Sequence, residues 1–485
     1  MNKDTSKLFR ELVNKHAKVY AELAKGPTPK ITIPDDICID IYLIYSTFKK
    51  AGFDCYLVGG CVRDSLLGRI PKDWDMATNA TTKEITELFK DKLPIIPTGV
   101  EFGTVTIMCE DRGYEVTTYR GDMYDSEDRN FHHPTAIEYV ETIEEDLSRR
   151  DFTINAMAYD INDNIIIDPF GGQEDLQDKT IECVGRAGER FMEDPLRMLR
   201  AIRFSAQLGF KISSKVNTAI WNNAELIEGI SGERKQMELN KILLSNPAVL
   251  NTFAAETLLS EIIPELTVLR IETQNNPYHI YDAFEHSIEA TKVIEPELHL
   301  RLAMLLHDIG KARTGTTDEN GIDHYYGHGK VSEELARDIL KRLKYSNEVI
   351  DKTCILIKEH DRTLKVNKKA LKKVLNLLGE EGTKDLLKVR WADICAQNPI
   401  YLKERAFKTF QLTNMLEEIV NTKEPFSRKD LNIAGNALMK IGFKFGPEIG
   451  EVLDYLLDMV QENPELNNYD KLEKAAKAYL KEKEK

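Results

Sequence analysis

The chain has 485 residues, of which 42% are apolar and 30% are charged, a composition typical of a folded globular protein rather than a disordered or collagen-like one. Its 66 Lys and Arg against 80 Asp and Glu give a net charge of −14, which excludes a uniformly basic nucleic-acid coat but not a local basic surface. Seven cysteines without a C-x-x-C pair exclude a disulfide scaffold and favour a reducing, cytoplasmic compartment. No apolar run reaches the roughly 18 residues that a membrane span needs.

Taken in chain order, the elements predict a mixed α/β segment followed by a long helical one. Two helical stretches are expected in the first 50 residues, broken by the prolines of 26–34. Strands are expected at Cys55–Val58 and Ile165–Ile167, and a hairpin at Val105–Cys109 and Tyr114–Tyr119. Beyond about residue 170 the helical period of apolar residues dominates. The predicted parts are an N-terminal helical extension (1–50), an α/β head (51–170), a helical neck (171–265), a fourth domain (270–400) and a helical tail (401–485).

Two carboxylates and a glycine turn are the first chemical signal in the head. Asp73 and Asp75 are two residues apart, so on a strand they point to the same face and require a cation, for which Mg²⁺ is the natural choice. The glycine pair Gly59-Gly60 follows an apolar strand and allows backbone N–H groups to approach a phosphate. Arg63 adds a forked donor nearby. Together these residues predict a metal-assisted site for a phosphate-bearing substrate.

This set resembles the head of the bacterial-type, class II tRNA nucleotidyltransferases, the family that includes CCA-adding enzymes and bacterial poly(A) polymerases. The resemblance covers about residues 55–245. Its four ordered motifs are Tyr56–Asp64 with Asp73 and Asp75, Arg149–Ala156, Glu193–Arg197 continuing to Arg200 and Arg203, and Gly232–Arg234.

The resemblance implies a polymerase-β-like nucleotidyltransferase fold for the head and two Mg²⁺ ions, one at the RNA 3′-hydroxyl and one at the triphosphate. Asp73 and Asp75 match the metal ligands, and Glu115 is the candidate third catalytic carboxylate. Arg150 and Asp151 match the residues that read the ribose 2′-hydroxyl. Asn155 belongs to the same nucleotide-binding motif. The stretch 122–134 resembles the family's mobile loop, which is tied to the change from CTP to ATP.

Asp194 and Arg197 are the candidate base-reading pair, because residues three apart in a helix share a face. Cytosine and adenine both present an amine donor beside a ring-nitrogen acceptor, which a carboxylate and a guanidinium complement. Uracil and guanine present the reverse order. One such pair therefore accepts CTP and ATP and rejects UTP and GTP without a nucleic-acid template. Arg200 and Arg203 continue the series and are expected to hold the triphosphate.

A second constellation lies in the helical part. His286, His307, Asp308 and Asp393 occur in the order H…HD…D, and nitrogen and carboxylate ligands suit a divalent transition metal. Over about residues 280–400 they resemble the HD family of metal-dependent phosphohydrolases, in which the metal is held by such a set. His328 and His360 fall where some relatives place ligands of a second metal. A degenerate HD fold kept as an RNA-binding scaffold is the alternative.

The expected architecture is therefore an α/β nucleotidyltransferase head followed by an all-α neck, an HD domain and a helical tail. The expected function is template-independent addition of CCA to the 3′ end of tRNA from CTP and ATP, with pyrophosphate released and a separate HD-type phosphohydrolase activity. The open alternatives are an A-adding enzyme or a poly(A) polymerase of the same family, an RNA-directed metal phosphohydrolase with a non-catalytic head, and a non-enzymatic RNA-binding scaffold. The oligomeric state is left open.

Overall fold

The structure, a computed structural model, describes residues 31–123, 136–271 and 274–483. It divides into two units. Unit 1 comprises residues 1–238 and 253–262, and unit 2 comprises 239–252 and 263–485. Within the described ranges, no helix combines the length and the apolar character that crossing a membrane requires.

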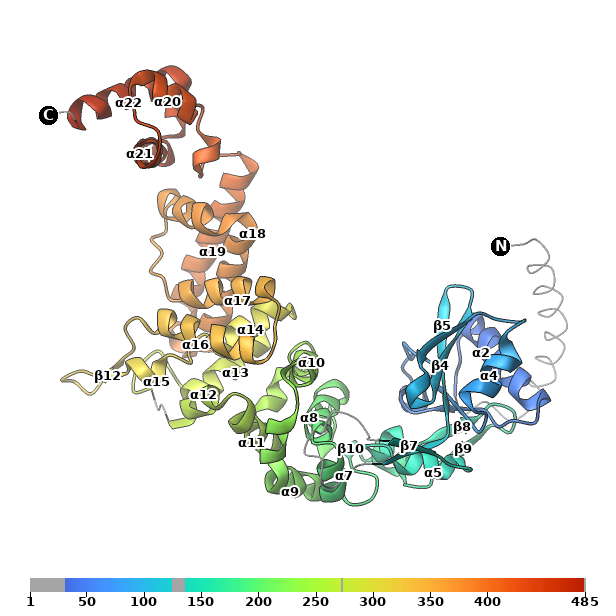
Figure 1. The fold of residues 1–485 in the computed structure, drawn as a ribbon. Coiled ribbons are helices and arrows are strands. Elements are labelled where there is room, and N and C mark those ends of the chain that lie inside the picture. Colours follow the sequence, from blue (N-terminus) through green and yellow to red (C-terminus); the bar gives the residue numbers. More distant parts are fainter. Residues whose placement is uncertain (1–30, 124–135, 272–273, 484–485) are drawn as a thin grey trace. The chain divides into compact units, whose positions relative to one another are not determined.

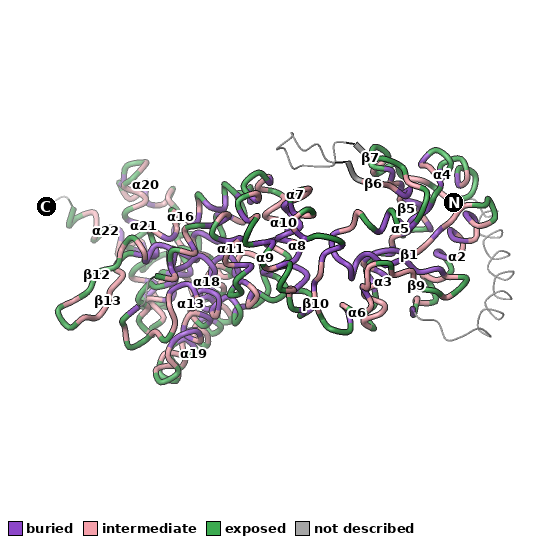
Figure 2. The backbone as a smooth tube through the Cα atoms, turned by 90° about the horizontal axis from the view of Figure 1, so that it is seen from below, coloured by how far each residue is buried: buried purple, intermediate pink, exposed green. Residues whose placement is uncertain are grey.

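The head of unit 1 contains a seven-stranded sheet (Figure 1). The strand order is β3-β4-β5-β2-β1-β8-β9; β2 and β5 pair in parallel and the other neighbours are antiparallel. The central strands β1 and β2 are buried, which makes the middle of the sheet a rigid support (Figure 2). The strands are β1 (Tyr56–Val58), β2 (Met76–Thr78), β3 (Ile95–Gly99), β4 (Thr104–Cys109), β5 (Arg112–Thr118), β8 (Ala158–Asp160) and β9 (Ile165–Ile167), with β6 (Arg120–Met123) and β7 (Ala136–Tyr139) forming a separate hairpin.

Helix α2 (Asp35–Lys50) packs on the head rather than standing apart from it. Its Phe48 ring lies 5.2 Å from that of Phe89, and its Asp40 accepts a hydrogen bond of 2.8 Å from the Tyr114 hydroxyl. The predicted boundary at residue 50 is therefore wrong for this helix, because its apolar face completes the head's core. Residues 1–30 of the expected extension lie outside the described residues. The other head helices are α3 (Gly60–Leu66), α4 (Thr82–Phe89), α5 (Ile143–Ser148), η1 (Val100–Phe102) and η2 (Thr153–Asn155).

The neck is helical, as expected, with α8 at its centre. Eleven of its thirteen residues are buried, including Arg197 and Arg203. Its C-terminus ends at Gly209, whose φ of 73° is the left-handed conformation that favours glycine at a helix end. The neck elements are α6 (Gly172–Gln177), α7 (Ala187–Glu193), α8 (Leu196–Leu208), α9 (Ser214–Asn223), η3 (Ala224–Gly229), α10 (Gly232–Leu243), η4 (Pro247–Asn251) and α11 (Phe253–Ile262), with short strands β10 (Thr180–Ile181) and β11 (Lys211–Ile212).

Over its described residues, unit 2 is helical apart from the small antiparallel pair of β12 and β13. Helix α18 is kinked at Gly379, where φ is 73°. Helix α22 lies in the predicted helical tail and buries Leu472 and Ala476 in a core cluster. The elements are α12 (Pro264–Thr267), η5 (Val268–Ile271), α13 (Ala283–Val293), α14 (Leu298–Leu306), α15 (Lys311–Thr314), β12 (Thr316–Thr317), β13 (Asp323–His324), α16 (His328–Arg342), α17 (Asn347–Glu359), α18 (Lys368–Cys395), α19 (Pro399–Asn421), η6 (Arg428–Asp430), α20 (Gly435–Ile441), α21 (Pro447–Glu462), η7 (Pro464–Leu466) and α22 (Tyr469–Lys483).

Candidate functional site

The carboxylates of the head gather at the start of β2. Asp73 and Asp75 precede the strand and flank Trp74, which is only 4% exposed, so the alternation of the chain turns both acids away from the core. Val116 pairs with Met76 in the parallel β2–β5 ladder, which brings Glu115 beside Asp75. Burial, followed by the charges of Glu115 and Asp73, raises the pKa of Asp75 to about 6. A partly buried carboxylate with two further carboxylates beside it forms a site that a divalent cation stabilises.

The glycine turn lies between β1 and α3. Gly59 has a φ of 76°, and a Cβ there would lie 2.7 Å from the Arg150 guanidinium. Glycine is therefore needed both for the backbone conformation and for the close approach of Arg150. Arg63 donates to the Asn155 side chain at 2.7 Å, so α3 is tied to the Arg149–Ala156 motif. Arg63, Arg150 and Asn155 therefore lie around the glycine turn, and their contact with a nucleotide stays a prediction.

Asp151 is held by three donors. Its carboxylate accepts from Arg200 at 2.6 Å, from the Asn155 amide at 3.3 Å and from the Phe152 N–H at 2.9 Å. Burial raises the pKa of Asp151, but the charges of Arg200 and Arg197 and the hydrogen bonds from Arg200 and Asn155 together outweigh that effect and lower it to about 2. Asp151 therefore connects the head to α8, and its proposed contact with a ribose hydroxyl stays a prediction.

Asp194 and Arg197 are near each other, but they do not share one helix. Asp194 follows the end of α7 in an extended conformation (φ −141°, ψ 99°), and α8 begins at Leu196 after Pro195. The expectation of one continuous helical face is wrong, because Pro195 starts a new helix and disfavours a helical conformation in the residue before it. The Asp194 carboxylate instead accepts from the Leu196 N–H at 3.1 Å.

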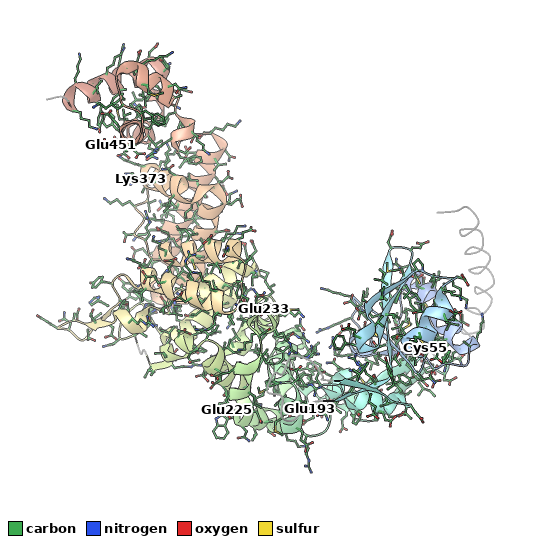
Figure 3. All side chains as sticks on the ribbon, in the orientation of Figure 1. Cys55, Glu193, Glu225, Glu233, Lys373 and Glu451 are labelled. Atoms are coloured by element: carbon green, nitrogen blue, oxygen red, sulfur yellow. The ribbon has the colours of Figure 1, made fainter. Side chains whose placement is uncertain are left out.

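Asp194 and Arg197 are each held by different polar contacts. Asp194 pairs with Arg234 of the Gly232–Arg234 motif at 3.0 Å. Arg197 donates to Glu193 at 2.7 Å and to the Arg149 carbonyl at 3.0 Å. Glu193 ends α7 and is labelled in Figure 3. Both side chains are thus pre-oriented, which is what a protein template for a base requires.

Arg203 occupies a buried position. It pairs with Glu238 of α10 at 3.0 Å, and the two side chains are 8% and 5% exposed. Burial and the charge of Arg200 lower the pKa of Arg203 to about 10. The guanidinium groups of Arg63, Arg200 and Arg203 lie 5.2, 5.5 and 4.2 Å from the centroid of the Phe204 ring. Glu238 and Phe204 were not expected from the sequence, because no motif singles out a lone Glu or Phe in a helix.

The histidines of the second constellation converge in unit 2. His286 Nε2 lies 3.0 Å from Asp393 and 3.6 Å from Asp308, and His307 Nε2 lies 3.2 Å from Asp308. His328 and His360 approach the other Asp308 oxygen, at 3.3 and 3.7 Å. Two groups of potential ligands therefore share Asp308.

Backbone carbonyls orient the four histidine rings through their Nδ1 atoms, and this sets the direction of their Nε2 atoms. The Nδ1 atoms of His286, His307, His328 and His360 lie 2.6–3.2 Å from backbone carbonyls, to which they can donate. That tautomer leaves all four Nε2 lone pairs facing Asp308, an arrangement common around protein-bound metals. Gly310 makes the convergence possible, since a Cβ there would lie 2.6 Å from the His328 carbonyl.

A cavity of about 310 Å³ opens beside these residues. Three cations line it, Lys311, Arg390 and Arg405, together with Tyr326 and His324 from the β12–β13 hairpin and the segment after it. Lys311 lies 2.7 Å from Asp308, and Arg405 donates to Gln397, which itself donates to Asp393 at 2.9 Å. The cavity thus combines candidate metal ligands with positive charge, which suits an anionic ligand.

The fold and the carboxylate set of unit 1 define a nucleotidyltransferase head. A family model described as the poly A polymerase head domain matches residues 55–182, one described as "Probable RNA and SrmB- binding site of polymerase A" matches 209–269, and one for tRNA nucleotidyltransferase domain 2 matches 317–476.

Comparison with known proteins indicates which family of nucleotidyltransferases the chain belongs to. The chain is 31% identical to the CCA-adding enzyme of Leuconostoc mesenteroides over 93% of this chain and 99% of that one. The chain belongs to the family of CCA-adding enzymes. A second relative, from Lactiplantibacillus plantarum, is 44% identical, but the match spans about half of each protein, 42% of this chain and 49% of that one. The crystal structure of the Bacillus stearothermophilus CCA-adding enzyme in complex with CTP has 28% identity and a TM-score of 0.66 and covers 92% of this chain and 98% of that one.

Proposed function

We propose that the protein adds CCA to the 3′ end of tRNA, using CTP and ATP and releasing pyrophosphate. The observation that carries the proposal is the grouping of Asp73, Asp75 and Glu115 next to the glycine turn, in a chain that belongs to the CCA-adding family. Two Mg²⁺ ions bound to these carboxylates would neutralise the triphosphate and lower the pKa of the attacking hydroxyl. Burial, together with the charges of Glu115 and Asp73, raises the pKa of Asp75, and a site that disfavours a bare carboxylate in this way supports that fit.

The protein's own backbone and side chains would bind the phosphates and select the base. The N–H groups at Gly59 and Gly60 and the guanidinium of Arg63 would hold phosphate oxygens. Asp194 would accept from the base amine while Arg197 donates to the ring nitrogen. The tethers of this pair to Arg234 and Glu193 support the role, because a template must keep its geometry when no nucleotide is bound.

Product sequencing separates this activity from its alternatives. The full chain is given tRNA lacking CCA, lacking CA or lacking only the final A, with CTP and ATP together. We expect CCA, CA and A additions that stop at a complete end. Addition of A alone to every substrate indicates an A-adding enzyme, and long A tails indicate a poly(A) polymerase.

A second function is favoured by the convergence of four Nε2 atoms on Asp308. We propose that His286, His307, Asp308 and Asp393 hold a divalent transition metal in an HD-type phosphohydrolase centre, with His328 and His360 completing a second metal position. The donor set fits such ions, because neutral imidazoles with backbone-bound Nδ1 atoms and bridging carboxylates are established ligands. The metal would activate a water for attack on phosphorus.

The metal content of the purified chain tests this second function. Wild type should retain a divalent metal after dialysis and hydrolyse a phosphate monoester, whereas the double variant His307→Ala, Asp308→Ala should lose both properties. His299→Ala is the matched control, since it removes a histidine of the same unit that is paired with Asp385 and does not line the cavity. Equal metal content in wild type and double variant would refute the centre.

A further inference from the structure

Asp146 of α5 is a buried carboxylate that lies outside the four sequence motifs. Its side chain is only 1% exposed. One oxygen accepts from Arg149 Nε at 3.0 Å and from the Arg120 N–H at 3.4 Å, and the other accepts from Arg150 Nη2 at 3.2 Å. Burial raises the pKa of Asp146, but the charges of Arg150 and Arg149 outweigh it and hold the pKa below its ordinary value. Asp146 is therefore ionised and holds two guanidinium groups at once.

Arg150 connects Asp146 to the glycine turn. A guanidinium is a planar fork, so holding one of its nitrogens also sets the direction of the others. While Asp146 holds Nη2, Nη1 lies 3.5 Å from the Asn155 carbonyl and would lie 2.7 Å from a Cβ at Gly59. The charge of Arg150 also lowers the pKa of Asp75, against the larger effect of burial. The Arg150 guanidinium thus lies between Asp146 and the expected place of the nucleotide.

Helix α5 is fixed to the strands that carry the turn and the metal-binding carboxylates. The helix begins with a capping box formed by Thr142 and Glu145. Its apolar side chains share one buried cluster with residues of β1 and β2, namely Ile143, Leu147, Val58 and Ala77. Strand β1 leads into Gly59, and β2 begins directly after Asp75. Asp146 therefore approaches the turn from a helix that shares a core with the site.

Stability alone does not account for an ionised carboxylate at this depth. Replacing a buried ion pair by apolar side chains of similar volume is often neutral or stabilising. An apolar side chain in place of Asp146 would not, however, determine where a guanidinium points. The Nε of Arg150 is buried and has no hydrogen-bond partner among the described residues. Within that part of the chain, the contacts that orient this guanidinium are those with Asp146 and the Asn155 carbonyl.

We propose that Asp146 is a positioning residue for nucleotide binding, which orients the Arg150 guanidinium at the glycine turn without touching the nucleotide itself. The inference rests on the proposed nucleotide addition and adds to that site a residue that no motif includes. Because Arg150 lies at the turn and not at the pair Asp194 and Arg197, Asp146 acts on the ribose triphosphate that CTP and ATP share. It does not act on the choice of base.

The variant Asp146→Asn tests the proposal, because the amide keeps the size of the side chain and removes the charge that holds the guanidinium. Calorimetry with CTP or ATP and Mg²⁺, without tRNA, gives the dissociation constant. Addition to tRNA lacking CCA, or lacking only the final A, gives KM and kcat. Both constants should rise by about 10- to 150-fold for each nucleotide, as expected for one hydrogen bond to a charged group. A merely structural role would lower kcat through a smaller folded fraction and leave KM unchanged.

A second variant tests the same link with the Asp146 side chain intact. In Arg150→Lys the charge is kept, but a single ammonium group cannot reach Asp146 and the glycine turn together. We expect a similar loss of affinity for CTP, and little further loss when Asp146→Asn is added, because both changes break one interaction. The matched control is Asp160→Asn. Asp160 is a buried carboxylate of the head, 7% exposed, that accepts from the Tyr45 hydroxyl at 3.2 Å, and its variant should bind CTP as wild type does.

Several results would overturn the inference. They are wild-type affinity for CTP in either single variant, fully additive losses in the double variant, a loss confined to one of the two nucleotides, and no binding of CTP by wild type. If Asp146→Asn lowers the melting temperature, the affinity of Arg150→Lys decides the question alone. If wild type binds CTP but adds no nucleotide to tRNA, the proposed function fails, and the dissociation constants still decide the role of Asp146.

Discussion

The buried ion pair between Arg203 and Glu238 allows a sharp test of how α8 is held. The pair spans 3.0 Å with both side chains under 10% exposed. Burial and the charge of Arg200 lower the pKa of Arg203 to about 10, so the fold disfavours this charge unless Glu238 pairs with it. Removing the guanidinium leaves the Glu238 carboxylate buried without its partner, and the net cost of breaking a buried pair in this way is about 3–5 kcal/mol.

We therefore expect Arg203→Met to destabilise the neck by about 3–5 kcal/mol, and the double variant Arg203→Met, Glu238→Met to recover most of that loss. Because a chain of 485 residues need not unfold in one step, the measurement is hydrogen exchange of α8 peptides in increasing urea. The sequence motif alone predicts a different result. Because the motif assigns Arg203 to the triphosphate, its loss should weaken the binding of all four nucleotides to a similar extent. Wild-type exchange in Arg203→Met combined with a uniform loss of nucleotide binding would refute the ion-pair reasoning.

Three further outcomes are expected. Asp194→Ala should lower kcat/KM for CTP and ATP and raise the relative use of UTP and GTP; equal losses for all four nucleotides would place base reading elsewhere. The pKa of the Asp151 carboxyl is about 2 in the folded protein and 3.8 in an unfolded chain. This group therefore contributes about 2 kcal/mol of stability above pH 4, which is lost as the pH falls towards 2. The acid unfolding curve of Asp151→Asn should be less steep than that of wild type, and identical curves would contradict this. Asp308→Asn should remove bound metal from unit 2, measured by elemental analysis, while nucleotide addition persists; its loss at an unchanged melting temperature would show that the two sites depend on each other.

Much of the head could be predicted from local patterns. The strand at Ile165–Ile167 has the bounds expected of it, and the hairpin around Glu110–Gly113 joins β4 and β5 nearly as expected. Short apolar runs ended by glycine or acidic turns carry this information in a few consecutive residues. The head's carboxylates could also be predicted, because their spacing already places Asp73 and Asp75 on one side of the chain.

Other features depend on contacts between distant segments. The spacing of Asp194 and Arg197 predicted that both lie on one helix. The structure shows that the helix is broken at Pro195 and that Asp194 is held separately by its ion pair with Arg234. The attachment of α2 to the head rests on Tyr114 and Phe89, far along the chain. In unit 2 the order of the histidines predicted their convergence, but not that all four direct Nε2 at Asp308. That direction is set by backbone carbonyls of the turns next to each histidine or of a neighbouring helix end.

The central claim is that the carboxylates beside the glycine turn carry nucleotide addition to tRNA. The most direct measurement compares wild type with Asp73→Asn, Asp75→Asn and the surface control Asp91→Asn on tRNA lacking CCA, with CTP, ATP and Mg²⁺, followed by sequencing of the 3′ ends. The account predicts complete CCA ends with wild type and the control, and no added nucleotide with Asp73→Asn or Asp75→Asn at an unchanged melting temperature. Near-normal CCA addition by either of these two variants would contradict it.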